Sequence, residues 1–242
     1  MKLEVCCYSI NDIITAINHG ADRIEFCAGR NEGGLTPSYG DLLQLSQLKL
    51  PVAIHPIIRP RGGDFYYSQT EINSMINDIQ LARELDYPGV VFGCLVSNGQ
   101  LDIINLLKLI KAADGLSITF HRAFDVCVDP ILALNQLNDL GIDRILTSGQ
   151  QQDAVKGIKL IEQLHQLSQS TLIMPGCGIR STNLALFKAI GITEFHSSAS
   201  RSLPSPMQYQ NQNVCMSHTK QDEFIRFSID PDEVEKMKQL LL

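Results

Sequence analysis

Short runs of apolar residues alternate with longer amphipathic segments along most of the chain. Each run is too short for a helix and is bounded by Gly, Pro or Ser, which is typical of buried strands. The runs predict strands over Leu3–Cys7, Arg23–Cys27, Val52–Ile58, Val90–Phe92, Ser117–His121, Arg144–Thr147, Thr171–Met174 and Glu194–Ser198.

The segments between these runs carry the signals of helices. Apolar residues repeat at helical spacing from Ile10, with Ser9 placed to cap the helix and Gly20 to end it. The capping box Ser68-x-x-Glu71 precedes a second segment with the same spacing. Helices and strands are therefore expected to alternate along the chain.

Eight strands that alternate with eight helices predict a closed (β/α)8 TIM barrel, a single domain over residues 1–242. A glycine that ends a helix and leads into a strand recurs at Gly20 and Gly141, which indicates a repeating unit of about 30 residues. A doubly wound open sheet is the alternative. Its glycine fingerprint is missing, however, because Cys7-Tyr8-Ser9 occupies the turn after the first strand.

One segment does not fit the repeat. Residues 200–229 follow the eighth strand, are rich in Gln, Asn and Ser, and show little periodicity. A long connection of this kind in a compact domain is usually functional or disordered. We expect it to start at the mouth of the barrel and to serve as a lid or a dimer contact.

Composition narrows the choice of partners and location. The formal net charge is −6 and no basic run occurs, which argues against nucleic acid. The chain enters its first strand without a signal-like region, and no apolar stretch approaches the roughly 20 residues of a membrane span. The seven scattered cysteines, without a CxxC motif, suit a reducing compartment. We therefore expect a cytoplasmic protein without a membrane or nucleic-acid partner.

Polar residues follow several predicted strands, and the carboxyl ends of barrel strands meet at one mouth. Arg59 and Arg61 follow the third strand, where guanidinium groups could bind phosphate or carboxylate, with Asp64 in the same loop. Backbone amides after the last two strands could complete an anion pocket. The residues assigned to that part of the pocket are Gly176, Gly178, Ser197 and Ser198.

An enzyme would need an acid or base at this mouth. His121, with Glu25 or Asp125 near it, is the candidate group for proton transfer on a small anionic or phosphorylated substrate. Histidines and carboxylates in this number would also permit a divalent metal, and no organic cofactor is predicted. Glycines after strands also serve only as turns, and Arg–Asp pairs also lock loops, so the anion pocket rests on analogy with other barrels.

A second kind of chemistry is suggested by Cys6 and Cys27. They lie on neighbouring predicted strands, whose backbones are about 4.8 Å apart, so that a soft metal ion could bridge the two sulfurs. Thiolates select copper(I) over hard ions. The stagger of neighbouring barrel strands works against this arrangement, and both residues could equally be small buried hydrophobes.

Several motifs together resemble one known family. The chain is similar to the CutC family, known as the copper homeostasis protein family, over nearly its whole length. The motifs are Leu3-Glu-Val-Cys6, Gly20-Ala-Asp-Arg-Ile-Glu25-x-Cys27, Gly33-Gly-Leu-Thr-Pro-Ser38, Ile58-Arg-Pro-Arg-Gly-Gly-Asp-Phe65, Thr119-Phe-His-Arg-Ala-Phe-Asp125, Leu146-Thr-Ser-Gly149 and His196-Ser-Ser. This resemblance implies a cytoplasmic (β/α)8 barrel that forms a homodimer, with copper(I) bound by Cys6 and Cys27.

Overall fold

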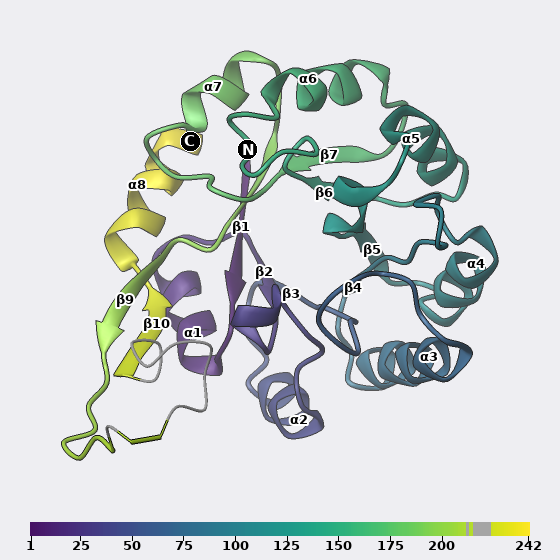
Figure 1. Cartoon of the computed structure of the whole chain (residues 1–242). Helices are drawn as coiled ribbons and strands as arrows, with labels where there is room; N and C mark the ends of the chain where they lie inside the picture. The colour runs from purple at the N-terminus through teal and green to yellow at the C-terminus, as the bar shows by residue number, and fades with distance from the viewer. Residues whose placement is uncertain (212, 215–223) are drawn as a thin grey trace.

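Eight parallel strands form the wall of a barrel, and helices surround it (Figure 1). The computed structural model describes residues 1–211, 213–214 and 224–242. The barrel strands are β1 (Lys2–Cys7), β2 (Arg23–Phe26), β3 (Ala53–Pro56), β4 (Gly89–Phe92), β5 (Ser117–Phe120), β6 (Arg144–Thr147), β7 (Leu172–Pro175) and β8 (Glu194–Ser197). The predicted (β/α)8 barrel is confirmed, and most predicted strands differ from the observed ones by a residue or two at their ends.

A helix follows each barrel strand in the described residues, and only β9 and β10 interrupt this alternation, between β8 and α8. They are α1 (Ile10–Asn18), α2 (Tyr39–Gln47), α3 (Gln69–Glu84), α4 (Ile103–Ala112), α5 (Pro130–Asp139), α6 (Ile158–Leu167), α7 (Leu184–Ala189) and α8 (Pro231–Leu241). The predicted caps are present: Ser9 accepts a hydrogen bond from the Asp12 backbone, and Ser68 and Glu71 form the capping box. No helix in the described part of the chain combines the length and apolar character that crossing a membrane requires.

The order of the strands brings the ends of the chain together. β1 pairs in parallel with both β2 and β8, and β4 to β7 pair in sequence. The Ile58 backbone donates to the Val91 carbonyl and joins β3 to β4. In this register Glu4 lies opposite Arg23 on one side and His196 on the other, while Cys6 lies opposite Glu25. Side chains alternate along a strand, so Glu4 and Cys6 both point into the barrel.

The segment after β8 contains structure that the sequence did not predict. β9 (Ser200–Pro204) and β10 (Ile225–Ile229) form an antiparallel pair at the edge of the molecule beside α1 (Figure 1). Asp12 of α1 accepts hydrogen bonds from the Ser228 hydroxyl and the Ile229 backbone and so attaches this pair to the barrel. Strands are therefore present at both ends of a segment in which the sequence analysis had predicted none. A lid or dimer contact over residues 200–229, of which 212 and 215–223 lie outside the described residues, stays a prediction, as does the homodimer.

Candidate metal and ligand site

A cavity of about 210 Å³ opens at the carboxyl ends of the barrel strands. Its walls combine apolar, basic and sulfur-containing side chains contributed by most of the βα loops. The lining residues are Cys6, Tyr8, Glu25, Gly33, Ile57, Arg59, Phe65, His121, Arg122, Leu146, Cys177, Gly178, His196 and Ser198. The position is the one at which barrel enzymes carry their active sites.

A pair of cysteines lies beside this cavity, and one of them, Cys6, lines it. The Sγ atoms of Cys6 and Cys27 are 3.7 Å apart, and the Cys27 Sγ is 3.4 Å from a Glu25 carboxylate oxygen. Both thiols are buried. The stagger between neighbouring strands is real, since Cys6 lies opposite Glu25 rather than Cys27, but the side chains reach across it.

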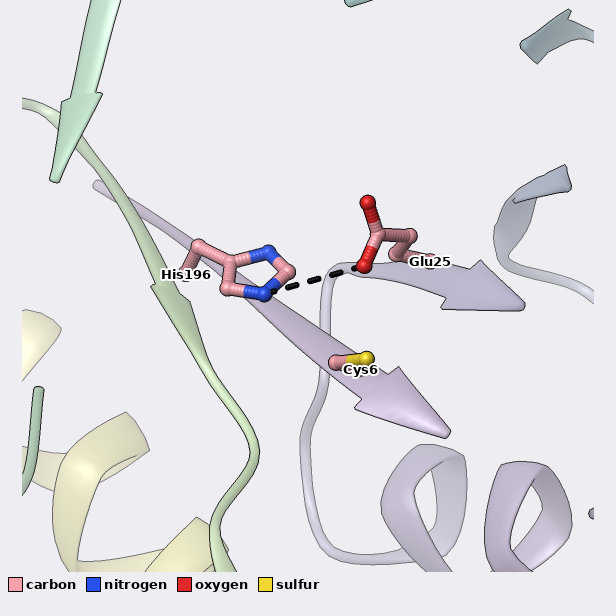
Figure 2. Close-up of side chains that lie close together, drawn as sticks. All are labelled: Cys6, Glu25 and His196. Carbon is pink, nitrogen blue, oxygen red and sulfur yellow. Dashed lines mark ion pairs between the residues drawn. The ribbon is translucent and has the colours of Figure 1, made fainter. Parts of the chain in front are cut away.

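A histidine and a carboxylate complete a cluster of possible metal ligands. One ligand atom from each of Cys6, Glu25 and His196 lies within 4.8 Å of the others, and all three residues are buried. Figure 2 shows them converging from β1, β2 and β8. The His196 Nε2 atom is 3.8 Å from a Glu25 carboxylate oxygen. Sulfur, imidazole and carboxylate therefore surround one point in the barrel.

A hydrogen bond with Glu4 holds the His196 ring in position. Its Nδ1 atom is 2.7 Å from Glu4 Oε1, which leaves Nε2 to face Cys6 and Glu25. A carboxylate on the far nitrogen is the common way in which proteins orient a metal-binding imidazole. The sequence analysis named His196 only within a family motif and gave it no role, since its partner Glu4 lies 192 residues away.

The same contacts determine the charges of the cluster. The hydrogen bond with Cys27 holds the pKa of Cys6 well below its usual range against the effect of burial, and His196 acts in the same direction. Burial raises the pKa of Cys27, as it does that of Glu25. Although burial favours a neutral ring, the Glu25, Cys6 and Glu4 side chains raise the pKa of His196. The directions of these shifts favour the thiolate form of Cys6 and the protonated form of the His196 ring.

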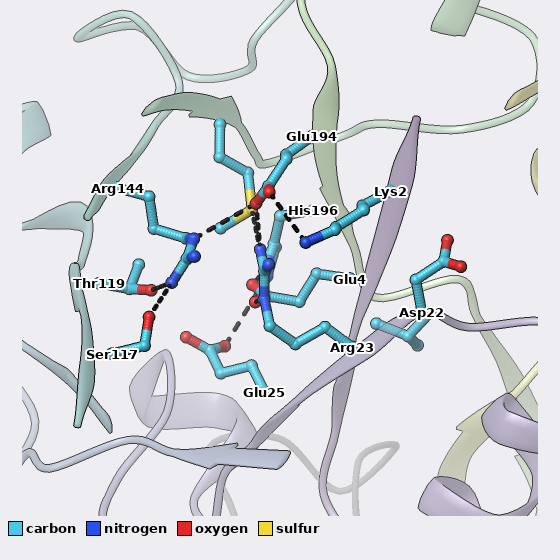
Figure 3. Close-up of polar contacts among 12 residues, drawn as sticks. Lys2, Glu4, Asp22, Arg23, Glu25, Ser117, Thr119, Arg144, Glu194 and His196 are labelled. Atoms are coloured by element: carbon cyan, nitrogen blue, oxygen red, sulfur yellow. Dashed lines mark hydrogen bonds and ion pairs between the residues drawn. The ribbon is translucent and has the colours of Figure 1, made fainter. Parts of the chain in front are cut away.

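Beneath the cluster, charged side chains fill the barrel where apolar ones are usual (Figure 3). Arg23 bridges Glu4 and Glu194, with its Nη2 2.7 Å from the Glu194 carboxylate. Arg144 adds a second contact to Glu194 at 3.2 Å. Arg23, Glu4 and Glu194 are each at most 5% exposed. This buried network fixes Glu4, and through Glu4 it fixes the His196 ring.

The two arginines predicted to bind an anion have different surroundings. Arg59 is buried and lines the cavity, and its guanidinium donates to the carbonyls of Glu32, Gly34 and Gly63. Arg61 is not among the lining residues and is paired with Asp64 at 2.9 Å and with Glu71 at 2.6 Å. The structure therefore brings Arg59 to the cavity, while Arg61 and Asp64 pair with each other in the loop.

The three residues considered for acid–base catalysis are not hydrogen-bonded to one another in the described structure. Glu25 belongs to the metal-ligand cluster, and His121 lines the cavity with its Nδ1 accepting the Ala123 backbone N–H at 3.2 Å. Asp125 is bound by Arg122 at 2.7 Å and by the Ser148 backbone. Its contacts fix the loop after β5 to the loop after β6.

The glycines and serines assigned to an anion pocket lie at the ends of β7 and β8. Gly178 and Ser198 line the cavity. A side chain at Gly176 would collide with Leu146, since its Cβ would lie 2.4 Å from the Leu146 Cδ1. The Ser197 hydroxyl donates to the Ile179 carbonyl at 2.6 Å and so connects the end of β8 to the segment after β7.

Comparison with known proteins identifies the family. The profile of the CutC family matches residues 1–201. A CutC family protein from Pectobacterium atrosepticum is 50% identical over 239 residues, which cover 98% of this chain and 94% of the relative. The chain belongs to the CutC family. The resemblance seen in the sequence motifs is thereby confirmed.

Solved structures agree with the CutC assignment. The CutC protein from Streptococcus agalactiae has a TM-score of 0.78 and 32% identity, covering 82% of this chain and 98% of that one. Its name marks it as a candidate for copper homeostasis. A 3-hexulose-6-phosphate synthase from Salmonella typhimurium, with a TM-score of 0.62 and 13% identity over 100% of this chain and 98% of its own, shares the barrel fold.

Proposed function

We propose that this CutC family member is a cytoplasmic copper(I)-binding protein that takes part in copper homeostasis. The observation that carries the proposal is the 3.7 Å separation of the Cys6 and Cys27 sulfurs, with Cys6 in the wall of the cavity and Cys27 buried next to it. The name of the Streptococcus agalactiae relative, which refers to copper homeostasis, also supports a role in copper handling. Both ligands must stay reduced to bind the ion, and a cytoplasmic location maintains that state.

The spacing of the sulfurs fits one bridging ion. Two metal–sulfur bonds of about 2.3 Å that meet at a tetrahedral angle place their sulfurs about 3.8 Å apart. The Nε2 atom of His196 offers a further ligand on the Cys6 side, because Glu4 occupies Nδ1 and a ligand nitrogen of His196 lies within 4.8 Å of the Cys6 sulfur. Thiolate and imidazole together are a soft to borderline donor set, which favours copper(I) over calcium or magnesium.

The protonation of the cluster couples binding to proton release. Cys27 and His196 both hold a proton when no ion is bound, since their pKa values are raised. Ligands must be deprotonated to coordinate a metal, so each copper(I) ion that enters displaces protons. Affinity should therefore increase as pH rises.

Anaerobic titration with copper(I) against a chromogenic chelator tests the proposal. The parent should bind one tight equivalent, and the Cys6→Ser/Cys27→Ser double variant should lose it. Cys94→Ser is the matched control, because Cys94 is an equally buried thiol outside the cavity. The proposal is wrong if the double variant keeps the affinity of the parent, or if the Cys94 variant loses as much as the double variant.

A further inference from the structure

Two side chains that line the cavity each carry a hydrogen-bond donor without an acceptor. Arg59 and His121 both line it, and each is at most 4% exposed. The Arg59 Nε and the His121 Nε2 are buried without a hydrogen-bond partner in the described structure. Leaving such a group unpaired costs about 1–3 kcal/mol, and more when the group is charged. Neither atom takes part in the proposed copper(I) site.

The hydrogen bonds of His121 determine which of its nitrogens carries the proton. Burial and the nearby charge of Arg59 lower the pKa of His121 to about 3, so the ring is neutral near pH 7. Nδ1 accepts the Ala123 backbone N–H and therefore has no proton. The single ring proton must then lie on Nε2, which is a donor. This assignment leaves His121, a residue of the cavity wall, with an unpaired donor.

Arg59 brings a positive charge without a counter-ion. Its three hydrogen bonds go to backbone carbonyls, and no carboxylate pairs with it in the part of the chain that the structure describes. Buried charges in proteins are usually paired. By contrast, Arg122 and Arg61 have carboxylate partners.

The other residues that line the cavity indicate the chemical character of the non-anionic part of the ligand. The Arg59 guanidinium lies 4.9 Å from the centre of the Phe65 ring, and the His121 ring lies at the same distance from it. Ile57 and Leu146 add further apolar surface to the cavity. An apolar wall beside two unpaired donors suits a molecule with one anionic group and a small hydrocarbon or aromatic part.

We propose that the cavity binds a small organic anion, whose carboxylate or phosphate group accepts hydrogen bonds from Arg59 and from His121 Nε2. The anion lies above Cys6 and His196, on the side of the cluster that faces the cavity mouth. This site does not depend on copper(I) binding. It also differs from the pocket predicted from the sequence, because Arg61 and Asp64 are absent from it and His121 donates rather than abstracts a proton.

Calorimetric titration with three probes tests the proposal. Benzoate and phenyl phosphate supply the two anionic groups, and benzamide is the neutral control. All titrations contain a metal chelator, so that a failed copper(I) site would not change the result. At least one anion should bind and benzamide should not, with the tighter anion showing whether a carboxylate or a phosphate is preferred.

Variants locate the binding. His121→Asn keeps an oxygen able to cap the Ala123 backbone but removes the Nε2 donor, and should weaken the binding of the anion about tenfold. Arg59→Lys should weaken it as well, whereas Arg83→Gln should not, because Arg83 donates to the Ala112 carbonyl outside the cavity. The proposal is overturned if neither anion binds, if benzamide binds equally well, or if His121→Asn binds like the parent.

A measurement on the parent covers the case in which a variant does not fold. Nitrogen-15 NMR of labelled histidine should show the His121 proton on Nε2, with a shift when the bound anion is added. A proton on Nδ1, or a resonance that does not respond to either anion at saturation, would also overturn the proposal.

Discussion

Replacing Arg23 with methionine is expected to destabilise the protein by about 3–5 kcal/mol, the range for breaking a buried ion pair. The change leaves the Glu4 and Glu194 carboxylates inside the barrel without their shared partner. Removing one member of such a network costs more than the network itself contributes, because the remaining charges stay buried. Urea unfolding of parent and variant measures the difference.

Two further variants sharpen this result. Arg23→Lys keeps the charge but loses the planar fork that reaches both carboxylates, and should give an intermediate loss. Arg61→Met removes an arginine that also contacts two carboxylates, but at the half-exposed surface, and should change the midpoint far less. Equal losses from Arg23→Met and Arg61→Met would show that the buried network does not have the importance given to it here.

Acidification should expose the second large effect, which comes from His55 and His121. Burial lowers the pKa of His121 to about 3 and that of His55 to about 4, against 6.5 for an ordinary histidine. Between these lowered values and pH 6.5, the two histidines are therefore protonated in the unfolded chain and neutral in the folded protein. The stability from these neutral rings is complete above pH 6.5 and is lost as the pH falls toward the lowered values.

The size of the stability loss depends on the pH range over which the two histidines stay neutral in the folded protein and become protonated in the unfolded chain. Between pH 7.5 and pH 5.0 each histidine should account for a loss of about 2 kcal/mol, or about 4 kcal/mol for the pair. Unfolding free energies at the two pH values are compared for the parent and the His55→Asn/His121→Asn double variant. The double variant should lose about 4 kcal/mol less on acidification, and identical losses would show that the two rings are not held neutral by the fold.

The barrel itself could be predicted from the sequence because its signals are local. Each strand is a short apolar run, and caps such as Ser9 and Ser68 mark where helices begin. β10 was missed although Ile225, Phe227 and Ile229 alternate with polar residues. Its five residues adjoin a long stretch rich in Gln, Asn and Ser, and that composition obscured the alternation.

For the candidate site, the sequence could predict only features that depend on the side-chain alternation within a single strand. The two-residue period places Cys6 and Cys27 on inward faces, and the reach across the stagger is a matter of side-chain length. The role of His196 depends on the closure of the barrel, which brings β8 beside β1 and Glu4 beneath the ring. The spacing of residues along the chain does not predict the contact between Glu4 and His196.

The contrast between Arg59 and Arg61 has a similar origin. The two residues are separated by one proline, yet Arg59 turns inward to three loop carbonyls and Arg61 turns outward to Asp64 and Glu71. Which arginine faces the cavity depends on the path of the loop after β3, and composition does not specify that path.

The most direct test of the central claim is X-ray absorption spectroscopy of the copper(I)-loaded protein. A single ion held between Cys6 and Cys27 predicts a coordination shell with two sulfurs and a nitrogen from His196. The two sulfurs should be absent from the spectrum of the Cys6→Ser/Cys27→Ser variant. A shell of nitrogen and oxygen alone, or a two-sulfur shell that persists in the double variant, would contradict the proposed site.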